Sequence, residues 1–317
     1  MFLSTQHLTI GYENHVVQTD LNLEMQRGKF ICVLGTNGCG KSTLFRTLAG
    51  LQPSLGGTTL LDGKDVRKLS STEKSLLFAI VLTDRVELEN TTVSDVVAMG
   101  RYPYSSWLGG LNNEDKQMIT RSLEQVRLEH KSSWQFAALS DGERQRVMIA
   151  KALAQDTPLI LLDEPTAHLD LPNRVEIMLL LQKLAHETNK SVLLSTHELD
   201  LAQQAADEIW LMKQTDGVIC GLPEDLVLNG AFQTVFATDA FSFNRENGTF
   251  SMNFHYTKNI RIVAKDEYFY WTARAFARLG YSVNEQSATI VEIKGGKWLF
   301  NDVEYDSLGE LIAILEE

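Results

Sequence analysis

The segment FICVLGTNGCGKST, residues 30–43, decides the fold of this chain. It opens with the apolar run Phe30–Leu34, which predicts a short buried strand, and Ser42–Leu51 continues with helical spacing. The loop between them, Gly35–Thr43, matches the pattern GxxxxGK[ST] in the strand–loop–helix context that the pattern requires. A glycine turn without a ligand is the alternative, and the flanking strand and helix weigh against it. The segment therefore predicts a site for the phosphates of a nucleotide.

Each residue type in this loop has a physical reason. Glycines let backbone N–H groups face the α- and β-phosphates, and the first turn of the helix adds its positive dipole. Lys41 is expected to reach the β- and γ-phosphates and to act in catalysis, and the Ser42 hydroxyl to hold the Mg²⁺ ion that accompanies ATP. The predicted nucleotide-binding residues of the loop are Gly35, Asn37, Gly38, Cys39, Gly40, Lys41, Ser42 and Thr43.

A second apolar strand is predicted over Leu159–Leu162, and it ends in the carboxylates Asp163 and Glu164. Such a pair is often only the polar rim of a sheet, but a phosphate-binding loop elsewhere in the chain gives it a chemical use. Asp163 is predicted to orient the Mg²⁺ shell, and Glu164 to polarise the attacking water. The two motifs together indicate hydrolysis of a nucleoside triphosphate.

A third segment, Leu139–Glu143, reads LSDGE and precedes the helical run Arg144–Ala154. By itself it is a helix cap whose first turn suits an anion. In its place between the two other motifs it resembles the signature sequence LSGGQ of ABC transporter ATPases. On these motifs the chain is identified as a member of that family, and the resemblance covers roughly residues 1–225. It implies a P-loop α/β fold and ATP hydrolysis.

The resemblance gives roles to residues that would be weak candidates alone. Tyr12 is similar to the aromatic that stacks on adenine, and residues 167–170, which end at Asp170, resemble the D-loop. His197 in Ser-Thr-His resembles the switch histidine. A tyrosine before a turn or a histidine after a strand is more often packed or solvated, so the order and spacing of the motifs carry these roles. His197 and Glu164 complete the expected catalytic set with Lys41.

ABC ATPases act as dimers, and the resemblance implies a composite site. Two copies sandwich two ATP molecules, and the signature of one copy completes the phosphate-binding loop of the other. Ser140, Gly142 and Glu143 are therefore expected to act in trans. ATP is expected to close the dimer and hydrolysis to open it, which converts the nucleotide state into geometry.

Two positions depart from the family pattern. Related importer ATPases carry a glutamine in the Q-loop, where this chain has Thr83. A hydroxyl is shorter than an amide, so Thr83 would reach Mg²⁺ only through water. Asp141 stands where the signature usually has glycine. A carboxylate near a γ-phosphate repels it unless the carboxylate points away or a cation balances it.

The composition limits the remaining possibilities. With 317 residues, 44% hydrophobic and 22% charged, the chain is long enough for one large or two unequal domains. The net charge of -12 argues against nucleic acid as a partner, because clustered Lys and Arg bind phosphate backbones. The longest apolar run, Leu76–Leu82, is far shorter than the roughly 20 residues of a membrane-spanning helix. Residues 1–26 do not resemble a secretory signal, so we expect a cytoplasmic protein.

Two domains are predicted. Residues 1–228 are expected to form the ATPase domain, with a helical subdomain at about residues 84–157 that includes a capping box at Thr92 and Asp95. Residues 229–317 are expected to form a small α+β accessory domain, because most aromatic residues of the chain fall there, too many for a disordered tail. Its predicted elements are a strand at Asn259–Lys265, a helix at Asp266–Leu279, a hairpin turning at Gly295 and Gly296, and a last helix capped by Ser307 and Glu310.

The kind of ABC protein is indicated by Val97–Tyr104, which reads VAMGRYPY. It resembles a stretch of the ATPases of FecCD-type importers for iron-siderophores, haem or cobalamin, where it lies close to the permease. The resemblance implies a peripheral ATPase on the cytoplasmic face of the inner membrane, paired with a second copy and an integral permease dimer. A separate binding protein would deliver the cargo. The alternative is a non-transport ABC ATPase such as an iron-sulphur assembly subunit.

The cysteines give a further expectation. Cys32, Cys39 and Cys220 have no paired or CxxC spacing, which fits a reducing compartment and offers no zinc site. Cys39 stands beside a helix N-terminus, an environment that lowers the pKa of a thiol. It is therefore predicted to be the most reactive of the three.

Overall fold

The structure, a computed structural model, describes residues 2–13, 15–82, 88–104, 110–167, 169–215 and 217–316. The chain divides into two compact units. The larger unit comprises residues 1–237 and 243–249, and the C-terminal unit comprises residues 238–242 and 250–317. The domain limits expected from the sequence, 1–228 and 229–317, stay predictions.

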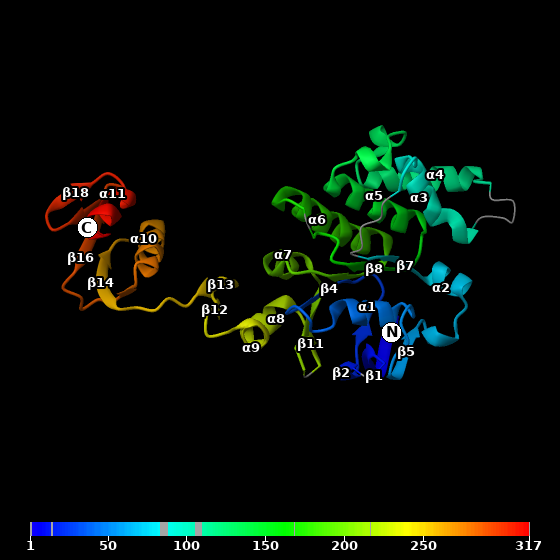
Figure 1. Ribbon diagram of the computed structural model, residues 1–317, viewed down its shortest axis with the longest axis horizontal. Helices are drawn as coiled ribbons and strands as arrows, with labels where there is room; N and C mark the ends of the chain where they lie inside the picture. The colour runs from blue at the N-terminus through cyan, green and yellow to red at the C-terminus, as the bar shows by residue number, and fades with distance from the viewer. Residues whose placement is uncertain are drawn as a thin grey trace. The chain divides into compact units, whose positions relative to one another are not determined.

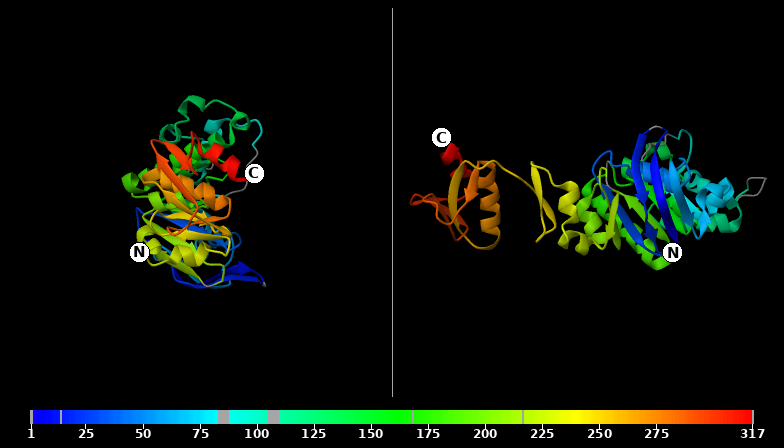
Figure 2. Two further views of the ribbon diagram at one scale, coloured as in Figure 1. Left: turned by 90° about the vertical axis from the view of Figure 1, so that its left-hand side faces the viewer. Right: turned by 90° about the horizontal axis from the view of Figure 1, so that it is seen from below.

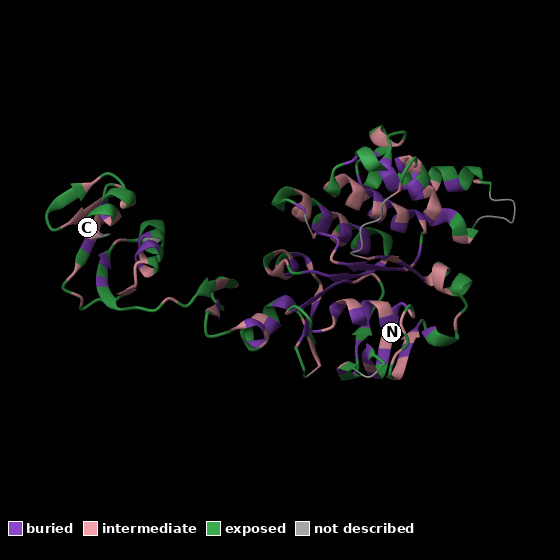
Figure 3. Cartoon of the chain, in the orientation of Figure 1, coloured by how far each residue is buried: buried purple, intermediate pink, exposed green. Residues whose placement is uncertain are grey.

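The larger unit is built on a six-stranded sheet whose strands are β4 (Phe30–Gly35), β7 (Phe78–Val81), β8 (Leu159–Asp163), β9 (Ser191–Ser195), β10 (Glu208–Met212) and β11 (Val218–Gly221). Their order is β11-β10-β4-β9-β8-β7, and neighbours are parallel except β10 and β11. The strands β4, β8 and β9 are buried along their whole length (Figure 3), as in a parallel sheet covered on both faces. The strands predicted at Phe30, Leu159 and Ser191 are confirmed.

Helices cover both faces of this sheet (Figure 1). They include α1 (Lys41–Leu48), α6 (Leu171–Thr188), α7 (Leu199–Ala205), α8 (Pro223–Leu228) and α9 (Ala231–Phe236). The helix α1 lies on one face, while α6 and α7 lie on the other. The carboxyl ends of β4, β8 and β9 thus open between the helices that follow them, which is where open α/β sheets bind ligands.

A second, antiparallel sheet packs beside α1, with strands β1 (Leu3–Tyr12), β2 (His15–Leu21), β3 (Glu24–Met25), β5 (Gly56–Leu61) and β6 (Lys64–Asp65). It is followed by a short 3-10 turn, η1 (Val66–Lys68), and by α2 (Ser71–Leu77). Its apolar face shares one core with the main sheet, through residues such as Ile10, Phe45 and Trp210. This packing places the end of β1 next to the start of α1.

The helical part lies between β7 and β8 and contains α3 (Val93–Ala98), η2 (Met99–Tyr104), α4 (Asn113–Gln125), η3 (Glu129–Lys131), η4 (Phe136–Ala138) and α5 (Asp141–Ala154). The helices α3, α4 and α5 contact one another. Both bonds of the capping box predicted at Thr92 and Asp95 are present. Arg101 is buried and joins three elements, because it donates to Asp115 on α4 at 2.8 Å and to the carbonyl of Ala154 on α5 at 2.7 Å.

The C-terminal unit contains a five-stranded sheet and two helices, formed by β14 (Lys258–Val263), α10 (Asp266–Arg278), β15 (Tyr281–Val283), β16 (Ile290–Lys294), β17 (Lys297–Phe300), β18 (Val303–Tyr305) and α11 (Leu308–Glu316). The strand order is β15-β14-β16-β17-β18, and α10 runs beside β14 (Figure 2). Ile260, Phe276, Val291 and Leu311 form its core. Before it, β12 (Phe241–Asn244) pairs with β13 (Thr249–Met252).

The predicted hairpin and helices of this unit are confirmed. Lys294 pairs with Lys297 across a two-residue turn, and both turn glycines have positive φ, 59° and 79°, as such a turn requires. The last helix has half of the expected capping box, because Ser307 accepts from the N–H of Glu310, while the Glu310 carboxylate accepts from Asp306. Within the described residues, no helix combines the length and the apolar composition needed to cross a membrane.

Candidate functional site

The loop Gly35–Thr43 leaves the end of β4 and curls around the Lys41 side chain. Gly38 and Gly40 have φ values of 79° and 107°, a region that glycine adopts without strain. A β-carbon on Gly40 would also lie only 2.5 Å from a methyl group of Val17. The Lys41 ammonium is buried and donates to the carbonyl oxygens of Gly35 at 2.9 Å and Thr36 at 3.4 Å. The loop is thus a compact turn around a buried cation.

The helix α1 starts directly behind this turn. Its N-cap is Gly40, and the described residues contain neither a side-chain cap nor an acidic residue in its first turn. The first N–H groups of a helix have no acceptor within the helix and carry the positive end of its dipole. Together with Lys41, the start of α1 forms a positively polarised concavity that suits phosphate groups.

Gln18 anchors the loop, a contact that sequence reasoning missed. This buried residue of β2 donates its Nε2 to the carbonyls of Cys39 at 3.1 Å and Lys213 at 2.6 Å. Its Oε1 accepts from the N–H of Gly217 at 3.0 Å. A single glutamine in a strand belongs to no motif, so only the tertiary structure identifies this contact.

The prediction that the pKa of the Cys39 thiol is lowered is wrong. Cys39 is fully buried, and burial raises the pKa of its thiol above the ordinary value. The nearby Lys41 charge and backbone N–H groups lower it, but less than desolvation raises it. The side chain packs under Gly35, where an added β-carbon would lie 2.6 Å from the Cys39 sulfur. Cys39 therefore belongs to the loop as a packed residue.

Tyr12 ends β1 beside the first turn of α1. Its ring is half exposed, and its hydroxyl accepts a hydrogen bond from the Thr43 side chain at 3.2 Å. An open cavity next to the ring is lined by Gly11, Tyr12, Glu13, His15, Gln52, Pro53 and Leu55. An exposed aromatic at this distance from the phosphate loop is well placed to stack on a base.

Asp163 ends β8 deep in the sheet. Its side chain is buried, and its Oδ1 accepts a hydrogen bond from the Ser195 hydroxyl at 2.6 Å. Ser195 ends β9 and lies opposite Asp163 in the strand register. Sequence reasoning missed this serine, although its place at the end of a predicted parallel strand was a usable signal.

Glu164 follows with an unusual backbone. Its φ is 52°, in the left-handed region that glutamate rarely adopts. Its N–H donates to the carbonyl of Ser195 at 3.1 Å and lies 2.9 Å from the Ser195 hydroxyl oxygen. Strained residues of this kind persist where the surrounding structure holds them, and they cluster at functional sites.

The carboxylate of Glu164 meets His197. The two side chains approach to 2.7 Å between Oε1 and Nε2, and the imidazole is 44% exposed. His197 sits directly after β9 in a tight turn, because the N–H of Leu199 bonds back to its carbonyl at 3.0 Å. A water molecule at this carboxylate could therefore lose a proton to it while the histidine fixes its orientation.

The residues proposed for Mg²⁺ fit that ion chemically. Ser42 lies in the first turn of α1 and Asp163 at the end of β8, and these two elements are in contact. A hydroxyl and a carboxylate are the hard oxygen ligands that Mg²⁺ prefers, with the remaining positions left to water and phosphate oxygens. Thr83, the third residue considered for the metal, lies outside the described residues.

The signature segment forms the capped start of α5. Ser140 accepts from the N–H of Glu143, and the Glu143 carboxylate accepts from the N–H of Ser140. Glu143 also pairs with Lys131 at 2.5 Å, and this contact holds the pKa of its carboxyl below the usual value. Asp141 lies 3.8 Å from the Arg144 guanidinium, so a cation balances the carboxylate that departs from the family pattern.

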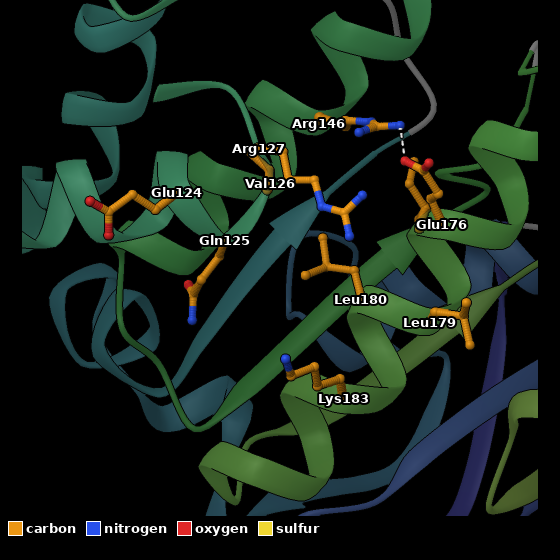
Figure 4. A pocket seen from close by; sticks show the side chains of 10 residues that line it. Glu124, Gln125, Val126, Arg127, Arg146, Glu176, Leu179, Leu180 and Lys183 are labelled. Carbon is orange, nitrogen blue, oxygen red and sulfur yellow. Dashed lines mark hydrogen bonds and ion pairs between the residues drawn. The ribbon is translucent and has the colours of Figure 1, made fainter. Parts of the chain in front are cut away.

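Asp170 caps α6 and is linked to the signature helix through Asn173. Its carboxylate accepts from the N–H of Asn173 at 3.2 Å. Arg146 on α5 donates to the Asn173 side chain at 2.6 Å and to Glu176 at 2.5 Å, the contact drawn in Figure 4. These bonds border a cavity of about 350 Å³ between the end of α4, α5 and α6. Sequence reasoning missed Arg146 and Asn173, which lie outside the quoted motifs.

Comparisons with known proteins agree with this geometry. The family described as "ABC transporter" matches residues 18–167, and the "Iron ABC transporter C-terminal domain" matches residues 257–316. An uncharacterised ABC transporter ATP-binding protein of Methanocaldococcus jannaschii is 38% identical over 82% of this chain and 90% of its own length. The iron(3+)-hydroxamate import ATP-binding protein of Bacillus subtilis is 37% identical over 75% and 88% of the two chains.

Solved structures show the same fold. A structure described as an inward-facing, metal-chelate type ABC transporter has a TM-score of 0.66 at 28% identity, over 79% of this chain and 95% of that chain. A dimeric ATP-binding cassette bound to ADP and phosphate has a TM-score of 0.61 at 25% identity, over 70% of this chain and 98% of that chain.

The chain therefore belongs to the ATP-binding proteins of ABC transporters. It is an ATPase with the ABC-type P-loop fold, extended by a C-terminal domain of strands and helices. Within that class it resembles the ATP-binding proteins of iron and metal-chelate transporters. Cassettes of this class form dimers and associate with a permease in transporter complexes.

Proposed function

We propose that the chain powers the uptake of a ferric siderophore or a similar chelate, such as haem or cobalamin, through a separate permease. The match of residues 257–316 to the iron transporter domain carries this proposal. The named substrate of the Bacillus subtilis relative, iron(3+)-hydroxamate, supports it. The ATPase itself would stand at the cytoplasmic face of the membrane, while a binding protein delivers the cargo to the permease.

For ATP hydrolysis, we infer that Glu164 takes the proton of the attacking water. The 2.7 Å contact with His197 and the backbone bonds to Ser195 hold its carboxylate in place, so little reorganisation is needed during the reaction. Lys41 and the N–H groups of Gly38–Ser42 would bind the phosphates, and Tyr12 would stack on the base. His197 would orient the carboxylate and approach the γ-phosphate.

The metal would be held by Ser42 and Asp163. When bound, Mg²⁺ supplies charge that neutralises the β- and γ-phosphate oxygens. The chain's own part is to orient the Asp163 carboxylate, and the hydrogen bond from Ser195 to its Oδ1 does so inside the sheet. Ser140, Gly142 and Glu143 of a second copy, with the D-loop around Asp170, would complete the phosphate site.

Two exposed tyrosines support a finer proposal for the permease contact. Gly100 has no room for a side chain, because a β-carbon there would lie 2.3 Å from the carbonyl of Lys151, and Arg101 is buried. These two residues thus anchor η2 within the helical part. Tyr102 and Tyr104 are 66% and 40% exposed. We infer that these tyrosines, not the arginine, meet the permease.

The catalytic assignment is tested with Glu164→Gln, which keeps the side-chain size and removes the charge. We expect kcat for MgATP to fall by about a thousandfold while the Kd for ATP changes less than about threefold, because the carboxylate acts mainly in the transition state. Glu187→Gln is the matched control, since this α6 carboxylate is 63% exposed and pairs with Lys183 at 3.8 Å. Hydrolysis by Glu164→Gln at the control rate would remove Glu164 from its role.

The proposed cargo class is tested by uptake into cells. The chain is co-expressed with its permease, and cells are supplied with a radiolabelled ferric hydroxamate, haem or cobalamin. We expect uptake of one of these chelates that depends on Glu164. Uptake of none of them, with hydrolysis intact, would reject the proposed cargo class and leave the ATPase assignment in place.

A further inference from the structure

A cavity of about 260 Å³ lies beside the candidate catalytic residues. Its walls come from the phosphate loop, from the turn after β9 and from α9, and we call it the switch cavity. The residues that line it are Gly35, Thr36, Asn37, Thr196, His197, Leu199 and Phe236. Among these described residues, Phe236 is the one that follows the ATPase motifs in the chain. It therefore brings a later segment into the surroundings of His197.

Phe236 is a firmly held wall of this cavity. It is 9% exposed and ends α9, which contacts β10 in the main sheet. Its ring lies 6.2 Å from the ring of Phe232, and Phe232 in turn lies 5.3 Å from Phe243. Phe232 is fully buried. A wall backed by packed rings and a sheet does not shift at low cost, since protein interiors are close-packed.

His197 is held more loosely than this wall. Its imidazole is 44% exposed and makes the 2.7 Å contact with Glu164. The short turn that carries it is fixed through its backbone and neighbours, by bonds such as those from the N–H of Leu199 to the His197 carbonyl, from the N–H of Glu198 to the Thr196 hydroxyl and from Arg174 to Glu198 at 2.6 Å. The volume next to the ring thus decides which rotamers the imidazole can adopt, and Phe236 limits that volume.

The segment that carries Phe236 also contacts α7, the helix that follows the turn of His197. Gln203 lies on α7, which begins at Leu199, and its Nε2 donates to the carbonyl of Gly248 at 3.4 Å. The segment 231–249 therefore borders the turn of His197 through Phe236 and contacts the following helix through Gly248. In the chain, this segment precedes the iron transporter domain of residues 257–316.

We propose that Phe236 is a positioning residue for hydrolysis: it restricts His197 to the rotamer that keeps Glu164 oriented. This proposal rests on the catalytic roles proposed above for Glu164 and His197. A larger cavity would release the imidazole and misplace the carboxylate, and a displacement of about 1 Å in an active site costs up to about a hundredfold in rate. ATP affinity should change little, because Lys41 and the start of α1 bind the phosphates independently.

The test compares Phe236→Ala, Phe236→Leu and Phe236→Tyr in the full chain, with MgATP as the substrate. We expect kcat to fall by about tenfold in Phe236→Ala and by less in Phe236→Leu, with the Kd for ATP within about twofold. Phe236→Tyr keeps the ring and should retain most of the rate. If Phe236→Ala does not fold, as judged by circular dichroism, the leucine and tyrosine variants decide the test.

Phe243→Leu is the matched control. Phe243 belongs to the same stack of rings but does not line the switch cavity among the described residues. A purely structural role for the stack predicts the same loss of kcat in Phe243→Leu and Phe236→Leu, and that outcome would overturn the proposal, as would an unchanged kcat in folded Phe236→Ala. An inactive Glu164→Gln together with an unaffected Phe236→Ala would reject this inference alone. Normal hydrolysis by Glu164→Gln would reject the proposed site itself.

Discussion

The starts of α1 and α5 are both expected to meet phosphate, yet they are built differently. The first turn of α1 follows Gly40 without a side-chain cap in the described residues, and the buried Lys41 stands at its entrance. The first turn of α5 is closed by a full capping box between Ser140 and Glu143, and Glu143 is paired with Lys131. One helix start is therefore uncapped and suited to an anion, whereas the other is capped and has the N–H of Glu143 already bonded.

The difference fits the proposed composite site, in which the start of α1 binds ATP within one copy and the start of α5 completes the site of a second copy. The start of α1 has no side-chain cap in the described residues, so phosphate binding there breaks no cap bond. At the start of α5, the Ser140 oxygen accepts from the N–H of Glu143 through a lone pair, and its O–H remains a donor that can reach a phosphate. In the proposed dimer, the signature of one copy would offer this hydroxyl to the nucleotide of the other copy.

Among variants at the two helix starts, Lys41→Ala at the start of α1 should have the largest effect. A charge-assisted bond to phosphate is worth about 2–3 kcal/mol, so the Kd for ATP should rise by about a hundredfold. Isothermal titration with ATP measures this directly. Lys183→Ala on α6 removes a lysine that is 68% exposed and serves as the control. An unchanged affinity in Lys41→Ala would show that the start of α1 is not the phosphate site.

A smaller effect is expected from Ser140→Ala at the capped start of α5. The variant should bind ATP with a Kd within about twofold of the normal value, but kcat should fall by about tenfold, because the residue acts across the dimer and late in the cycle. Size-exclusion chromatography of the Glu164→Gln protein with MgATP, with and without Ser140→Ala, reports dimer formation. If Ser140→Ala weakened ATP binding as strongly as Lys41→Ala, the two helix starts would not differ in the way described.

The smallest effect should come from Glu143→Gln, which leaves the Ser140 hydroxyl in place and removes the charge that pairs with Lys131. This pair is partly exposed, so we expect a loss of about 0.5–1 kcal/mol in the free energy of unfolding at neutral pH.

The pH dependence of that loss follows from the pKa of Glu143. Lys131 lowers this pKa in the folded state from 4.5, so the stabilisation is present above pH 4.5 and is lost as the pH falls through the folded-state value. The difference between the two proteins should therefore shrink below pH 4.5, as measured by urea unfolding. A difference that stays constant there would contradict the assigned ion pair.

Much of the fold could be predicted because its signals are local. The hairpin turn follows from Gly295 and Gly296 standing together between two predicted strands, and the capping box at Thr92 depends on a residue three positions away. The candidate site was equally readable where a motif lists its members in order, as in the phosphate loop and at Asp163 and Glu164.

The tertiary structure decided what depends on partners far along the chain. Ser195 reaches Asp163 across 32 positions only because β9 lies beside β8. Gln18 reaches Lys213 across 195 positions because packing brings β2 next to the residue that follows β10. Cys39 shows the same limit, since its neighbours in sequence suggest a lowered thiol pKa and its burial raises it. Sequence spacing determines hydrogen bonds within a turn of backbone, whereas burial and strand order arise only when the whole chain has packed.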